Sequence, residues 1–94
     1  MATTFPVVER LRAELRAAPF RRLDAAGGER LRRAHAEMHH SNAIEGVHPT
    51  PELVALFAMF VEERAPPEAT EGLVLRYMAE RIAAGARQEA TAAE

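Results

Sequence analysis

The sequence predicts an all-α fold, a small bundle of about four helices whose last three form the core. Alternating apolar residues and clusters of β-branched residues, both typical of strands, are missing, whereas Ala, Leu, Arg and Glu dominate. Proline and glycine residues divide the chain into four segments, and each segment has apolar side chains at helical spacing. The 94 residues are enough for one small domain.

The first helix is expected over residues 6–17, with Pro19 ending it. Its apolar positions are Val7, Val8, Leu11 and Leu15. Residues 24–28 are expected to be a loop because they end in two glycines. The second helix is expected over residues 29–45, and Gly46 suits the position after its end because only glycine adopts the left-handed conformation without penalty.

The third helix has the clearest start in the chain, with Thr50 as the N-cap residue and Pro51 in the first turn. Pro66 and Pro67 follow its end. Its expected buried face consists of Leu53, Val54, Leu56, Phe57, Phe60 and Val61. The fourth helix is expected to start near Thr70 and to end at Gly85.

These elements predict three parts of the chain. Residues 1–28 would form an N-terminal helix and a glycine-rich connector of unknown role, residues 29–84 a helical domain, and residues 85–94 a disordered tail. The chain has no cysteine, so it can form no disulfide, and its longest apolar run is too short to cross a bilayer. Charges interrupt residues 1–20, which argues against a signal peptide and predicts a cytoplasmic protein.

Glu45 raises the main functional question, because an acid near the negative end of a helix is disfavoured by about 0.3–1 kcal/mol. A step of about 100° per residue places Leu31, Ala34, Met38, Ser41 and Glu45 on one face. Glu45 therefore continues a face that should be covered, and a covered carboxylate needs a cation. That cation is either Arg76 or Arg81 of the same chain, in a structural ion pair, or an arginine of another molecule.

Ser41-x-x-x-Glu45-Gly46 resembles the inhibitory motif (S/T)xxxE(G/N) of antitoxins that control Fic-domain adenylyltransferase toxins. The following stretch, residues 46–82, is similar to the VbhA antitoxin family, in which the motif leads into a proline-containing turn, an apolar helix, a short break and a last helix. The resemblance covers about residues 38–82, and residues 1–28 have no counterpart in it.

The resemblance implies a function and a mechanism. Fic toxins transfer AMP from ATP to a hydroxyl of a target protein, and the antitoxin's glutamate pairs with the active-site arginine that would hold the ATP γ-phosphate. It implies that Glu45 is this glutamate, that Ser41 is the hydroxyl position and that Gly46 closes the helix. The partner would be a Fic-domain toxin, and the residues expected at that interface are Met38, Asn42, Ile44, Phe57, Phe60 and Tyr77.

The chain is not expected to be an enzyme or to need a cofactor. A Fic catalytic loop requires His-x-Phe-x-(Asp/Glu)-Gly-Asn-Gly-Arg, and His39 and His48 are followed by other residues. His35 and His39 lie one helical turn apart, but a metal site needs a third or fourth ligand. We expect Tyr77 to pack with its hydroxyl at the rim of the core.

Two alternatives remain open at this stage. The first half of the chain is rich in arginine and would suit a nucleic-acid-binding regulator that uses Arg30, Arg32 and Arg33, although the net charge of −2 gives no general attraction to nucleic acid. An arginine-rich face can also simply be solvated. The other alternative is a plain helical interaction domain in which Glu45 forms an internal ion pair.

Overall fold

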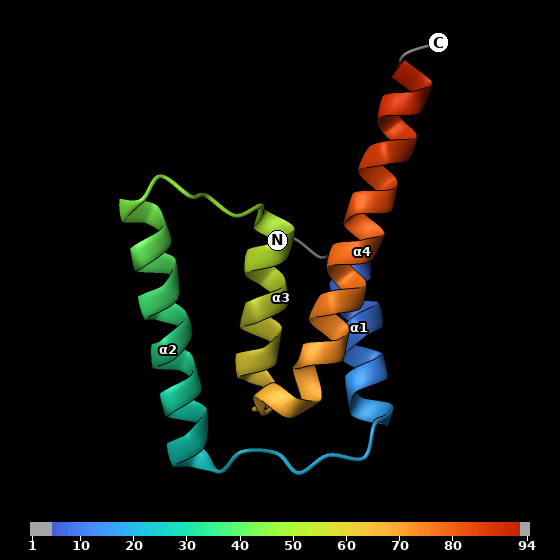
Figure 1. The fold of residues 1–94 in the computed structure, drawn as a ribbon. Coiled ribbons are helices and arrows are strands. Elements are labelled where there is room, and N and C mark those ends of the chain that lie inside the picture. Colours follow the sequence, from blue (N-terminus) through green and yellow to red (C-terminus); the bar gives the residue numbers. More distant parts are fainter. Residues whose placement is uncertain (1–4, 93–94) are drawn as a thin grey trace.

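The computed structural model describes the backbone of residues 5–92 and the side chains of residues 5–85, and it confirms the all-α class. The described part holds four helices and no strand: α1 (Pro6–Ala17), α2 (Ala25–Ile44), α3 (Pro51–Glu62) and α4 (Pro67–Ala92). In Figure 1, α3 stands between α2 on one side and α1 with α4 on the other. The connector from α1 to α2 runs along one end of the molecule, and the connector from α2 to α3 runs along the opposite end.

The hydrophobic core lies between α1, α3 and α4 rather than among the last three helices. Helix α1 has the predicted bounds, and it buries Val8, Leu11 and Leu15 in one cluster with side chains of α3 and α4. The partner residues are Leu56, Met59, Phe60, Ala65, Leu73 and Tyr77. Residues 1–28 therefore include a helix that is part of the core. The sequence of an amphipathic helix such as α1 shows which face is apolar but not which other helices pack against that face.

Helix α2 is the least buried of the four, because Gly27 is its only buried residue. The prediction of a loop over residues 24–28 is wrong. Asp24 caps the helix by accepting a hydrogen bond from the Gly27 N–H at 2.7 Å, and both glycines lie in the first turn. Gly28 packs closely against Arg64, since a Cβ there would lie 3.2 Å from two side-chain carbons of Arg64.

Helix α3 begins as predicted, with the Thr50 hydroxyl accepting a hydrogen bond from the Leu53 N–H at 3.2 Å. It ends in a Schellman motif, in which the Arg64 N–H donates to the Val61 carbonyl and the Ala65 N–H donates to the Phe60 carbonyl, both at 3.1 Å. Arg64 occupies the position that favours glycine, with φ of 50°.

Helix α4 starts three residues earlier and ends later than predicted. Pro67 suits the first turn of a helix, and the Thr70 hydroxyl donates to the Pro67 carbonyl instead of capping. The helix continues through Gly85 to Ala92, so most of the predicted tail (85–94) has helical backbone; residues 93–94 lie outside the described residues. Glycine lowers helix stability by about 1 kcal/mol but does not by itself end a helix.

Candidate functional site

The end of α2 presents the predicted motif in a fixed geometry. Glu45 is the C-cap residue, and Gly46 follows in the left-handed conformation with φ of 80°, which confirms the prediction for Gly46. The Gly46 N–H donates to the Ala43 carbonyl at 3.1 Å, and the Val47 N–H donates to the Asn42 carbonyl at 2.7 Å. These two bonds complete a Schellman motif, so the helix end and the chain direction after it are defined by the backbone.

Ser41 and Glu45 are exposed, and no side chain within residues 5–85 forms an ion pair or hydrogen bond with the Glu45 carboxylate. The hypothesis of an internal pair with Arg76 or Arg81 is therefore wrong for this structure. Arg76 pairs with Glu14, and Arg81 lies 2.9 Å from Glu52. The last turn of α2 also holds no lysine or arginine that would offset an acid at the helix C-terminus.

The exposed motif follows from how α2 packs. We predicted a covered face that includes Ala34, Ser41 and Glu45, but all three are exposed. The half-buried residues of this helix are Gly28, Leu31, His35, Met38, His39 and Asn42, and the two histidines contact Phe57 of α3. The half-buried face of α2 is therefore the one that carries the two histidines, and Ser41 and Glu45 lie on the exposed side of the helix.

Apolar side chains flank the exposed acid. Ile44 is 73% exposed and Val47 is 51% exposed. We use the term Glu45 tip for Ser41, Ile44, Glu45, Gly46 and Val47. A carboxylate between two exposed aliphatic side chains suits contact with a partner that offers a cation in an apolar surround, because such surroundings strengthen an ion pair.

The six residues expected at the toxin interface differ in their surroundings. Ile44 is exposed, whereas Met38, Asn42 and Phe57 are half-buried, and Phe57 lies against His35 and His39 of α2. Phe60 and Tyr77 are core residues, only 2% and 3% exposed, so in this conformation neither side chain is available to a partner. Both pack against the core that α1 completes. The Tyr77 hydroxyl donates to Glu52 at 2.8 Å, as expected for a tyrosine at the core rim.

A second glutamate, Glu63, occupies the same helix position as Glu45 but has the opposite surroundings. Glu63 is the C-cap residue of α3 and is 4% exposed. Three arginines contact its carboxylate: Arg16 at 2.7 Å, and Arg12 and Arg22 at 3.2 Å each. Hydrogen bonding from Arg16, aided by Arg22 and opposed by burial, lowers the pKa of Glu63 to about 2. Sequence reasoning missed this cluster because Glu63 lies 41 to 51 residues from its three arginines.

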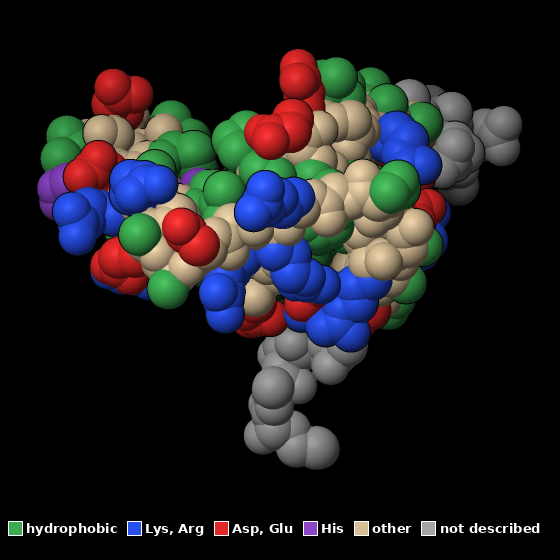
Figure 2. Space-filling model, turned by 90° about the horizontal axis from the view of Figure 1, so that it is seen from below, with side chains coloured by type: hydrophobic (Ala, Val, Ile, Leu, Met, Phe, Trp, Pro, Cys, Tyr) green, Lys and Arg blue, Asp and Glu red, His purple; other side chains and the backbone are tan. Residues whose placement is uncertain are grey.

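The Glu63 cluster accounts for part of the arginine-rich first half. Seen from the end where α1 stops and α2 begins, basic side chains gather on the surface with acidic ones among them (Figure 2). On α2, Arg32 bonds Glu29 at 2.9 and 2.5 Å, and Arg33 lies 3.9 Å from the same carboxylate. Many of these arginines therefore serve acids of their own chain, which weighs against a nucleic-acid interface; that alternative stays a prediction.

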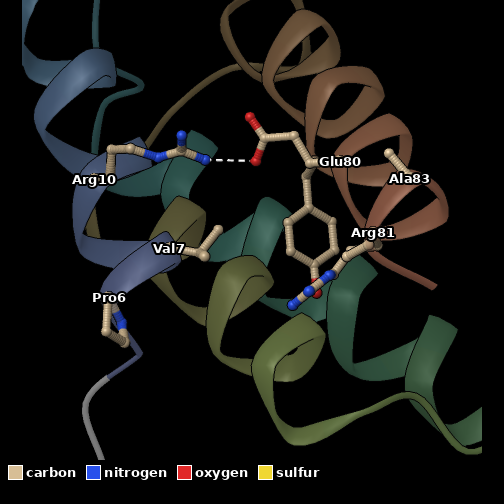
Figure 3. Close-up of a pocket in the computed structure, with 8 residues that line it drawn as sticks. Pro6, Val7, Arg10, Glu80, Arg81 and Ala83 are labelled. Atoms are coloured by element: carbon tan, nitrogen blue, oxygen red, sulfur yellow. Dashed lines mark hydrogen bonds and ion pairs between the residues drawn. The ribbon is translucent and has the colours of Figure 1, made fainter. Parts of the chain in front are cut away.

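A crevice of about 480 Å³ lies between α1 and α4 and is lined by uncharged side chains and three ionised ones (Figure 3). Arg10 points to Glu80, with 2.5 Å between nitrogen and oxygen, and Arg81 bonds Glu52. Every ionised group among its described lining residues is thus already paired. On α2, the residues that the structure describes add no third ligand to His35 and His39 that would make a metal site.

Comparison with known proteins yields no match to any family model, to any curated protein or to any solved structure. In the part of the chain that the structure describes, no helix is both long and apolar enough to span a bilayer. The Glu45 tip, which is exposed and has no cation among the described residues, is the candidate site.

Proposed function

We propose that this protein is an antitoxin that binds a Fic-domain toxin and inhibits its AMP transfer through Glu45. The observation that carries the proposal is the contrast between two C-cap glutamates. Glu63 is matched by three arginines of its own chain, whereas Glu45 has no cation within the described residues and stands exposed. An acid at a helix C-terminus without a counter-ion is disfavoured in the isolated protein, so its partner is sought in another chain.

The proposed mechanism is replacement of a phosphate by a carboxylate. An arginine that grips the ATP γ-phosphate offers two parallel N–H donors, and a carboxylate accepts both. Glu45 would occupy that arginine, so that ATP binds with its α-phosphate out of line for attack. Transfer of an AMP group depends on positioning, and a displacement of about 1 Å is enough to lower the rate about 10²-fold.

The remaining residues of the Glu45 tip would support this contact. Gly46 and the Schellman motif set the direction in which Glu45 projects, and Ser41 lies one turn earlier on the same exposed edge. Ile44 and Val47 would exclude water around the ion pair. The chain itself has no Fic catalytic loop, and we propose that it acts without catalytic groups of its own.

The test uses a toxin that carries the Fic loop, encoded next to this chain, and follows transfer of labelled AMP with the two proteins in complex. We expect Glu45→Ala to raise the transfer rate about tenfold or more, which corresponds to about 1.4 kcal/mol of barrier. The matched control is Glu37→Ala, because Glu37 is an exposed acid on the same helix. Gel filtration verifies that each complex remains intact.

Continued inhibition by an intact Glu45→Ala complex would contradict the proposed mechanism. Equal activation by Glu37→Ala would also contradict it, because the effect would then depend on the charge of α2 and not on the tip. A search for the Fic loop in the neighbouring reading frames identifies the toxin to be used.

A further inference from the structure

The contact between α2 and the rest of the molecule depends on two histidines. His35 and His39 both approach the Phe57 ring of α3 edge-on, with ring centroids 5.3 and 6.1 Å apart. No ion pair joins α2 to another helix within the described residues. Since α2 has only one buried residue, and that one in its first turn, these half-buried rings are central to how its remaining length is held.

The surroundings of His35 oppose its protonation. Its Nδ1 atom is buried and has no hydrogen-bond partner. Burial, together with the neighbouring His39, lowers the pKa of His35, while the backbone of Phe57 acts in the opposite direction. A proton on His35 would place a charge in this half-buried contact, where the Phe57 backbone opposes the cost of burial only in part, and burying a charge that no carboxylate neutralises is unfavourable.

The charged groups around His35 do not offset the cost of protonating it. The groove between α2 and α3, of about 410 Å³, is lined on the α2 side by Arg32 and His39 and on the α3 side by Glu62. Glu62 is the only carboxylate among these lining residues, and it already lies 3.0 Å from Arg12. Arg32 is bound to Glu29 and stays charged. No described lining residue offers a free acid to a protonated His35.

We infer that α2 is held against α3 only while His35 is neutral, so that mild acid releases this helix from a body that stays folded. The sign follows from linkage: the docked state disfavours the proton, so docking is complete above the ordinary histidine pKa of about 6.5 and weakens as the pH falls below it. The Glu63 cluster, which ties α1 to the end of α3, keeps its charge in this range, because the pKa of Glu63 is about 2 and its carboxylate remains ionised at pH 5. This inference concerns α2 itself and does not depend on the proposed function.

Amide hydrogen exchange of the full chain tests it, with protection factors corrected for the effect of pH on chemical exchange. Between pH 7.5 and pH 5, we expect protection along α2 to fall by up to about 30-fold, the limit for one histidine excluded from protonation when docked. A released helix of this length with two glycines is marginal alone, so its amides exchange. Protection of α1 and α3 should persist, which verifies that the body is folded.

Two substitutions assign the effect to one ring. His35→Phe keeps an aromatic edge against Phe57 and removes the proton, so α2 should stay protected at pH 5; His35→Leu is a second variant of the same kind. His40→Phe is the matched control, because His40 is exposed on the same helix, and it should keep the acid response. The inference is overturned if wild-type α2 loses less than about threefold, or if the His35 variants respond to acid as wild type does.

Discussion

At the residue scale, the two C-cap glutamates show how the surroundings decide the role of one residue type. Glu63 is buried at the end of α3 and neutralised by arginines from α1 and the connector that follows it. Glu45 ends α2 in the same Schellman geometry and is exposed. The first is a structural counter-ion that ties α1 to the end of α3, and the second is available to a partner.

Glu63 gives a direct prediction for stability. Removal of one member of a buried ion pair costs about 3–5 kcal/mol, and we expect Glu63→Gln to fall at the low end because Arg16 and Arg22 are half-exposed. Folding lowers the pKa of Glu63 from 4.5 to about 2, so its contribution is present above pH 4.5 and is lost as the pH falls toward 2.

Urea unfolding at pH 7 and at pH 2.5 measures both effects. The stability difference between wild type and Glu63→Gln should be large at pH 7 and much smaller at pH 2.5. Glu71→Gln, at an exposed position, is the control and should change stability by less than about 0.5 kcal/mol. A difference that stays constant with pH would contradict the assignment of Glu63 as the buried counter-ion.

At the element scale, the structure reverses the predicted roles of α1 and α2 in the hydrophobic core. Helix α1 buries three large side chains in the core, whereas α2 rests on α3 through half-buried residues. The lower burial of α2 leaves most of this helix exposed, as the proposed function requires.

Two leucine-to-alanine substitutions compare these helices. Leu15→Ala in α1 should lower the free energy of unfolding by about 2–5 kcal/mol, since Leu15 is 1% exposed and its loss leaves a cavity. Leu31→Ala in α2 should cost less than about 1.5 kcal/mol, because its side chain is half-buried and its site is open to solvent. Equal losses in urea unfolding would show that α2 belongs to the core as firmly as α1.

At the scale of the whole molecule, the sequence predicted features that depend on neighbouring residues, such as helix ends and caps. It did not predict contacts between residues that are far apart in the chain. The bounds of α1, the Thr50 cap and the conformation of Gly46 depend on neighbouring residues, and all three were predicted. The packing of Gly28 against Arg64 joins residues that are far apart in the sequence, and Phe60 and Tyr77 share a buried cluster with residues of α1. For the candidate site, the sequence indicated Glu45. That Glu45 has no counter-ion among the described residues could be seen only from the positions of the arginines in the fold.

The central claim is that Glu45 pairs with a guanidinium of a different polypeptide, and a double-mutant cycle on the complex tests it most directly. Glu45→Gln is combined with substitution of the toxin's phosphate-gripping arginine by Gln, and the dissociation constants of the four pairs are measured. If the two groups pair, each single change weakens the complex about tenfold or more, and the double change is no weaker than either single one. Effects that add in free energy, as for groups that do not touch, would contradict the claim.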